Sequence, residues 1–224
     1  MSAGFPRVGT LAAIAPFALW MALMLALPSS LEAYALRTAV VGFLVVALVI
    51  GFCPWRQAIC DFFSTRRFFA ALGWGFSTGI VAFFIWVLPE QSEWYRRFFI
   101  IGPAQSVDAS LGSRWLLTVK VIGSAFVIAP VEELFYRHFL YRFVSDTTVG
   151  RSSTRPIRFD LSAFLWTTLL FAAGHNRFLV AAIVGAAYCL VAVRAGLAAA
   201  IVAHITTNLI LGFYVLEFAQ WQFW

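Results

Sequence analysis

Long, uninterrupted runs of apolar residues constrain the fold of this chain more than any other feature. Most of the seven runs are near or above the ~17 residues that an α-helix needs to cross a bilayer, and the fifth and sixth are short. Inside a bilayer every backbone polar group must be satisfied within the protein, so helices or closed barrels are the possible spanning structures. The runs show none of the alternation that a barrel strand requires. They cover Leu11–Leu27, Thr38–Cys53, Phe68–Leu88, Trp115–Tyr141, Leu161–Gly174, Phe178–Val193 and Gly196–Glu217.

Composition supports the same fold. Hydrophobic residues make up 62% of the 224 residues and charged residues 12%, whereas globular domains carry about 25% charged residues. We therefore predict an all-α, polytopic transmembrane bundle of seven to eight helices. The count depends on the segment Glu93–Ser113, where aromatic residues flank Arg96 and Arg97. This segment is either a helix lying in the membrane interface or an eighth span.

The distribution of positive charge predicts topology, not a nucleic-acid partner. The net charge is +6, and most of the arginines lie between the apolar runs, as membrane topology requires. With seven spans, nine arginines fall on the side of the N-terminus and five on the other. We therefore expect a cytoplasmic N-terminus and no binding of nucleic acid. The first apolar run is long and bulky, which favours a retained first helix over a cleaved signal peptide.

Cysteines give no sign of a disulfide framework or of a catalytic thiol. The three of them are Cys53, Cys60 and Cys189, and the last lies in the middle of an apolar run. We interpret them as small apolar fillers.

Ionisable residues inside the apolar runs gather in the C-terminal half, first in the sequence Glu132-Glu133-x-x-x-Arg137. A charged residue at the centre of a bilayer costs about 2.5–3.5 kcal/mol on insertion scales, so such groups usually mark a functional site. Glu133 and Arg137 have the favourable i, i+4 spacing for an ion pair. Neighbouring helical residues point about 100° apart, so we expect Glu132 to face elsewhere as the freer carboxylate. Pro130 should interrupt the helical hydrogen bonds just before the acids.

Two further segments add imidazoles and an amide, in the sequences Phe171-x-x-x-His175 and His204-x-x-x-Asn208. Taken singly, the Glu132 motif also fits a surface salt-bridge cluster and the Phe171 motif an interfacial histidine. The His204 motif also fits polar contacts that hold helices together. Taken together with Glu132, they supply a base to activate water, a group to orient it and donors for an oxyanion. That set favours peptide-bond hydrolysis without a serine or cysteine nucleophile. A transporter that relays protons through Glu132 is a rival, although no inverted repeat supports it.

The three motifs, in this order on successive helices, resemble the CAAX protease and bacteriocin-processing family of membrane endopeptidases, which includes the type II CAAX prenyl endopeptidase. The small-residue segment Phe178–Val193, with Gly185 and Tyr188, is similar to a fourth family element. The resemblance covers about 124–212. It implies a catalytic core of four C-terminal helices, so we divide the chain at residue 115: 1–114 holds the N-terminal transmembrane helices and the interfacial segment, and 115–224 holds the catalytic core.

By position, the resemblance implies that Glu132 is the catalytic carboxylate and that His175 assists it. His204 and Asn208 would stabilise the oxyanion, while Glu133, Arg137 and Phe171 would support the site. The motif His-Glu-x-x-His of zinc proteases is absent, so we expect no cofactor and no metal, with zinc as the alternative.

The resemblance also bears on substrate and location. The expected partners are the lipid bilayer and a membrane-anchored protein or peptide substrate, and the expected location is the bacterial inner membrane. The rest of the chain is similar to a bacterial subgroup of CAAX protease-related proteins associated with exosortase-type sorting. The alternative is a non-proteolytic scaffold or immunity-type protein of the same family. The sequence leaves the physiological substrate and the oligomeric state open.

Overall fold

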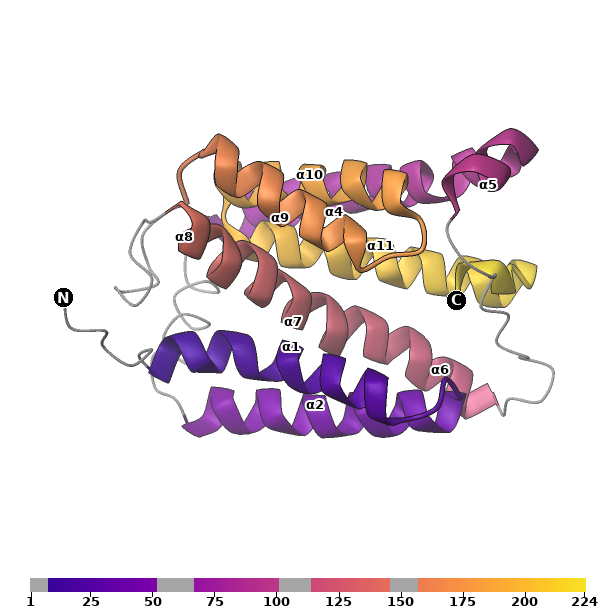
Figure 1. The fold of residues 1–224 in the computed structure, drawn as a ribbon, viewed down its shortest axis with the longest axis horizontal. Helices are drawn as coiled ribbons and strands as arrows, with labels where there is room; N and C mark the ends of the chain where they lie inside the picture. Colours follow the sequence, from indigo (N-terminus) through magenta and orange to yellow (C-terminus); the bar gives the residue numbers. More distant parts are fainter. Residues whose placement is uncertain (1–7, 52–66, 101–113, 146–156) are drawn as a thin grey trace.

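A computed structural model describes residues 8–51, 67–100, 114–145 and 157–224, and all regular structure in these residues is helical. The helices run roughly alongside one another as a bundle (Figure 1). Their bounds are α1 Val8–Ala26, α2 Leu31–Gly51, α4 Arg67–Val87, η1 Leu88–Gln91, α5 Glu93–Phe99, α6 Arg114–Gly123, η3 Ser124–Ile128, α7 Ala129–Glu133, η4 Leu134–Leu140, α8 Tyr141–Val144, α9 Leu161–Ala173, α10 Phe178–Ala195, α11 Leu197–Phe218 and η5 Trp221–Phe223.

These elements confirm the predicted all-α membrane bundle. Five helical stretches in the described residues are long and apolar enough to span a bilayer, and two shorter apolar helices, Leu11–Ala26 and Leu161–Ala173, accompany them. Each of the seven predicted runs therefore coincides with one helical stretch. The segment expected at the interface begins with the seven-residue helix α5, which is too short to span. Residues 101–113 of that segment, and residues 146–156 of the polar loop before α9, lie outside the described residues.

The long helical stretch Arg114–Val144 carries two wider π-helical segments, η3 and η4, on either side of α7. The backbone N–H of Ala129 bonds to the carbonyl of Ser124, five residues back. Pro130 follows directly and has no N–H to donate, so a π turn accommodates it without a break in the helix. The interruption predicted at Pro130 is therefore a local widening just before the two glutamates.

Helix α4 belongs to the same packed unit as the C-terminal helices, because it lies against both α10 and α11. Its glycines permit a very close approach: a Cβ at Gly79 would lie 2.6 Å from the carbonyl oxygen of Ala203 on α11. Small residues commonly allow such backbone contacts between membrane helices. Helices α1 and α2 pack against the other side of the Arg114–Val144 stretch. The division at residue 115 stays a prediction, and α4 adds a fifth helix to the surroundings of the predicted four-helix core.

Candidate active site

A buried ion pair ties the first motif to the neighbouring helix α10. Arg137 Nη1 donates to Glu133 Oε1 at 2.9 Å, as the i, i+4 spacing predicts. Both residues have an exposed fraction of 0%. Arg137 Nη2 also donates to the backbone carbonyl of Gly185 at 2.9 Å. The pair is therefore enclosed by protein, where removing either partner leaves an uncompensated charge.

His204 on α11 lies between the two neighbouring glutamates. Its Nδ1 is 2.9 Å from Glu133 Oε1, and its Nε2 is 3.9 Å from Glu132 Oε2. The sequence predicted that the two carboxylates would not face the same point, and they do approach different atoms. They nevertheless meet at one residue, because an imidazole presents nitrogens on two sides. The Glu132 side chain keeps 16% of its surface exposed, and the Glu133 side chain none.

Phe171 supports the site by covering its charges with an aromatic ring. The guanidinium carbon of Arg137 is 4.5 Å from the ring centre of Phe171, a distance typical of a cation–π contact. The same ring packs against the imidazoles of His175, at 4.6 Å between centres, and of His204, at 5.9 Å. A Cβ at Gly185 would lie 2.7 Å from Phe171 Cδ1. The glycine is therefore needed for α10 to lie this close to α9.

His175 lies just beyond the end of α9, in the turn toward α10. Its Nδ1 is 2.8 Å from the backbone carbonyl of Phe171. A carbonyl oxygen can only accept, so Nδ1 carries the proton and Nε2 is the free acceptor when the ring is neutral. Burial lowers the pKa of His175, which favours that neutral form. No direct hydrogen bond joins His175 to Glu132 in the described structure.

Asn208 faces the helix that carries the glutamates. Its Nδ2 donates to the backbone carbonyl of Ser124 at 3.0 Å, which fixes the orientation of the amide. The group has a second hydrogen that this bond does not use. The structure thus brings Glu132, Glu133, Arg137, His204 and Phe171 into one contact network, with His175 joined to it through the Phe171 ring and Asn208 one helical turn from His204.

The sequence did not predict the contacts of Tyr188 and Trp86 with the two site histidines. The ring of Tyr188 stacks on His204 at 4.9 Å between centres, with 28° between the planes. Its hydroxyl donates to Thr207 Oγ1 at 2.7 Å, and Thr207 in turn donates to the carbonyl of Gly79 on α4. Trp86 of α4 packs edge-on against His175 at 5.7 Å between centres. Their position as polar or aromatic residues within apolar helices could have marked them as candidates. Their contact partners depend on which helices lie side by side, and the sequence does not give this.

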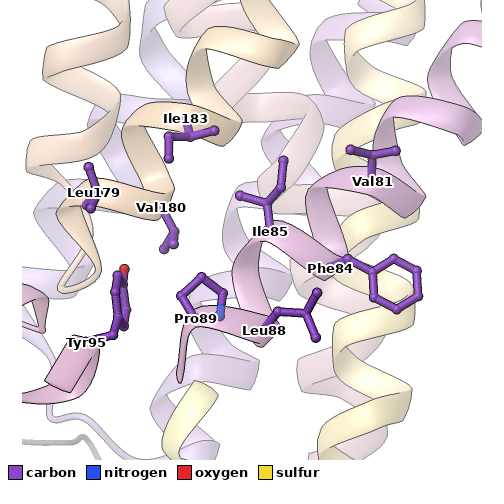
Figure 2. Close-up of a pocket in the computed structure, with 9 residues that line it drawn as sticks. All are labelled: Val81, Phe84, Ile85, Leu88, Pro89, Tyr95, Leu179, Val180 and Ile183. Carbon is purple, nitrogen blue, oxygen red and sulfur yellow. The ribbon is translucent and has the colours of Figure 1, made fainter. Parts of the chain in front are cut away.

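A pocket separate from this network lies between α4, α5 and α10, and Figure 2 shows its lining. It has a volume of about 530 Å³ and is lined by apolar side chains such as Ile85 and Val180, with Tyr95 at one end. None of its lining residues is an acid, a base or a thiol, so it offers no group for hydrolysis.

The described residues contain no cluster of three or more His, Cys, Asp or Glu side chains arranged to hold a metal ion. The metal-free mechanism stays a prediction, to be decided by experiment.

Residues 114–210 match the family model of the Type II CAAX prenyl endopeptidase Rce1-like proteins. This region of the chain is Rce1-like. The match includes Glu132, Glu133, Arg137, Phe171, His175, His204 and Asn208. No curated protein and no solved structure matches the chain.

The Rce1-like match confirms the resemblance seen in the three motifs. Together with the apolar helices, it makes this an integral membrane protein whose residues 114–210 are similar to a family of CAAX-type membrane proteases. The match begins at α6 and so leaves α1, α2 and α4 outside the family region.

Proposed function

We propose that this protein is a membrane-embedded endopeptidase, in which Glu132 activates a water molecule for attack on a peptide bond. The different surroundings of the two site carboxylates carry the proposal. Glu133 is occupied by Arg137 and His204 and is fully buried. Glu132 is partly exposed and 3.9 Å from the imidazole, so it is free to hold and deprotonate a water.

In the proposed reaction, Glu132 takes a proton from the water as the oxygen attacks the carbonyl carbon. His175 Nε2, left as an acceptor by the bond from Nδ1 to Phe171, helps to orient the water. As the tetrahedral intermediate collapses, Glu132 returns the proton to the leaving nitrogen. The residue thus acts as general base and then as general acid.

His204 and Asn208 are the proposed donors to the oxyanion. Nδ1 of His204 carries a proton when it donates to Glu133 Oε1, so Nε2 becomes a donor once the ring is an imidazolium. The buried carboxylate of Glu133 fixes the orientation of the ring through Nδ1, as the carboxylate of a serine-protease triad does for its histidine. The unused hydrogen of the Asn208 amide is the second donor. Preorganised donors of this kind typically contribute 10²–10³ in rate each.

The proposed substrate is a membrane-anchored protein or peptide, because the site is built from helices that span the bilayer. The matching family is named for a prenyl endopeptidase, which supports a substrate held near the membrane by a lipid or an apolar segment. We propose a cytoplasmic N-terminus on the arginine distribution, and the bacterial inner membrane on the resemblance to the bacterial subgroup.

A substrate trap tests the proposal. Glu132→Gln protein and wild type are purified from native membranes, and the captured peptides and proteins are compared by mass spectrometry. Glu93→Gln, on the exposed surface of α5, is the matched control. We expect a protein retained by Glu132→Gln and shortened in membranes that contain wild type or Glu93→Gln. A partner held equally by all three, with no shortening, would support the scaffold alternative and overturn the proposal.

A further inference from the structure

Two cations, Arg37 on α2 and Lys120 on α6, lie apart from the site, and among the described residues each contacts aromatic rings but no carboxylate. Arg37 is 7% exposed, its guanidinium carbon is 5.5 Å from the ring centre of Trp20, and its Nε lacks a hydrogen-bond partner. Lys120 Nζ is 4.9 Å from the ring centre of Tyr34 and 5.4 Å from that of Trp224. Neither residue has a carboxylate within ion-pair distance in the described structure.

The two positive charges share one aromatic residue. Arg37 also contacts the Tyr34 ring, at 6.0 Å from its centre, so one ring contacts both cations. Cation–π contacts recover part of the cost of removing a charge from water. They do nothing for the repulsion between two like charges in a low-dielectric interior. An anion that binds between these residues would compensate both charges, and this is what the arrangement lacks.

The cation pair lies along the helix that leads to the site. The Tyr34 hydroxyl is 3.4 Å from the carbonyl of Lys120, and the carbonyl of Ser124, one turn further along, accepts from Asn208. Lys120 and Glu132 are twelve positions apart, which is at most about 18 Å along the helix, because the π-helical segment Ser124–Ile128 lies between them. An extended peptide covers that distance with about five residues.

We propose that Arg37 and Lys120 form an anion subsite that binds a carboxylate of the peptide substrate, about five residues from the bond that is cleaved. This rests on the proposed function. The carboxylate is either the free C-terminus of the peptide or an acidic side chain. A peptide is favoured over a lipid headgroup because Lys120 lies on the helical stretch that carries Glu132, one turn before the Ser124 carbonyl that accepts from Asn208 of the proposed site. The subsite combines a residue of α2, outside the Rce1-like match, with one inside it.

The test uses N-palmitoylated decapeptides, randomised at the neutral positions, as the probe. One pool has a free C-terminal carboxylate, a second has a C-terminal amide, and a third has the amide and one aspartate at a scanned position. Retention on immobilised full-length Glu132→Gln protein in detergent is measured by mass spectrometry. We expect one of the two acidic pools to be retained about tenfold or more over the neutral amide pool, which corresponds to about 1.4 kcal/mol. The free-acid and aspartate pools distinguish the two sources of the carboxylate.

Arg37→Met and Lys120→Met, each in the Glu132→Gln background, should abolish this preference. Lys120→Arg, which keeps the charge, should retain most of it. Arg97→Gln removes an exposed cation of α5 and is the matched control. Equal retention of all three pools by the parent Glu132→Gln protein, shown to be folded by its thermal unfolding in detergent, overturns the subsite whether or not the further variants fold. An anionic phospholipid that copurifies with the parent protein but not with Arg37→Met would also overturn it.

Binding and cleavage are read separately. If wild type cleaves the pools but shows no preference for a carboxylate, the subsite is wrong and the proposed function stands. If carboxylate-dependent retention is seen with no cleavage by wild type, Arg37 and Lys120 form a peptide-binding anion site and the proposed function is wrong.

Discussion

His204 and Glu133, 71 positions apart in the chain, are joined by a buried hydrogen bond of 2.9 Å between Nδ1 and Oε1. The same carboxylate oxygen receives the bond from Arg137. One oxygen therefore links a structural ion pair to a residue that faces the proposed nucleophile site. Glu133 therefore belongs both to the buried ion pair and to the proposed catalytic site.

Glu133→Gln should destabilise the protein far more than Glu132→Gln does. Removing one partner of a buried ion pair leaves an uncompensated charge and typically costs about 3–5 kcal/mol. Glu132 is partly exposed and is not paired with Arg137, so its substitution should cost below about 1 kcal/mol. Thermal unfolding of the purified variants in one detergent measures the difference.

A double variant separates charge from packing in that comparison. In Glu133→Gln/Arg137→Met the buried guanidinium is gone, so part of the lost stability should return. Equal unfolding temperatures for Glu132→Gln and Glu133→Gln would show that the ion pair does not hold the site together.

Gly185→Ala should lower stability by about 1–3 kcal/mol, the usual cost of overpacking a core. The added methyl would lie 2.7 Å from the Phe171 ring, and the carbonyl of Gly185 is a partner of Arg137. Gly73→Ala is the control, because a Cβ at Gly73 meets nothing within 4 Å. We expect the control to match or exceed wild-type stability, since alanine is the better helix former. Unfolding in detergent and proteolytic activity are both measured. A Gly185→Ala protein as stable as Gly73→Ala would mean that α9 and α10 do not need this close approach.

The local features of the fold could be predicted from the sequence because they depend on neighbours in the chain. Apolar length gives the helices, and the i, i+4 rule gives the pair between Glu133 and Arg137. The contact of His175 with the Phe171 carbonyl is also local. None of these features depends on which helices pack against one another.

The remaining contacts could not be predicted, since they depend on the order of helices in space. Nothing in the sequence around Tyr188 indicates that its ring stacks on His204 or that its hydroxyl reaches Thr207. The angle of about 100° between neighbouring helical residues also does not say which group lies between Glu132 and Glu133. A single imidazole with nitrogens on two sides occupies that space.

Chelators should leave the proteolytic activity unchanged. The proposed reaction uses Glu132 to activate water, so it needs no zinc-bound hydroxide. We expect the initial rate after treatment with EDTA or 1,10-phenanthroline, followed by removal of the chelator, to stay within about twofold of the untreated rate, a difference below about 0.4 kcal/mol in the barrier. Metal analysis of the same samples accompanies the rate. Loss of activity that zinc restores would favour the zinc alternative.

Tyr188→Phe and Tyr188→Ala should separate the two contacts that this residue makes. Phenylalanine keeps the ring stacked on His204 and loses only the bond to Thr207, which typically contributes about 1 kcal/mol. Alanine removes the ring, leaves a cavity beside the imidazole and should cost about 3–5 kcal/mol of stability. Because the ring fixes the plane of His204, we expect Tyr188→Ala to lower kcat more than it raises KM, and Tyr188→Phe to stay close to wild type. If the two variants lose kcat equally, the hydroxyl chain through Thr207 to Gly79 orients the site, and stacking does not.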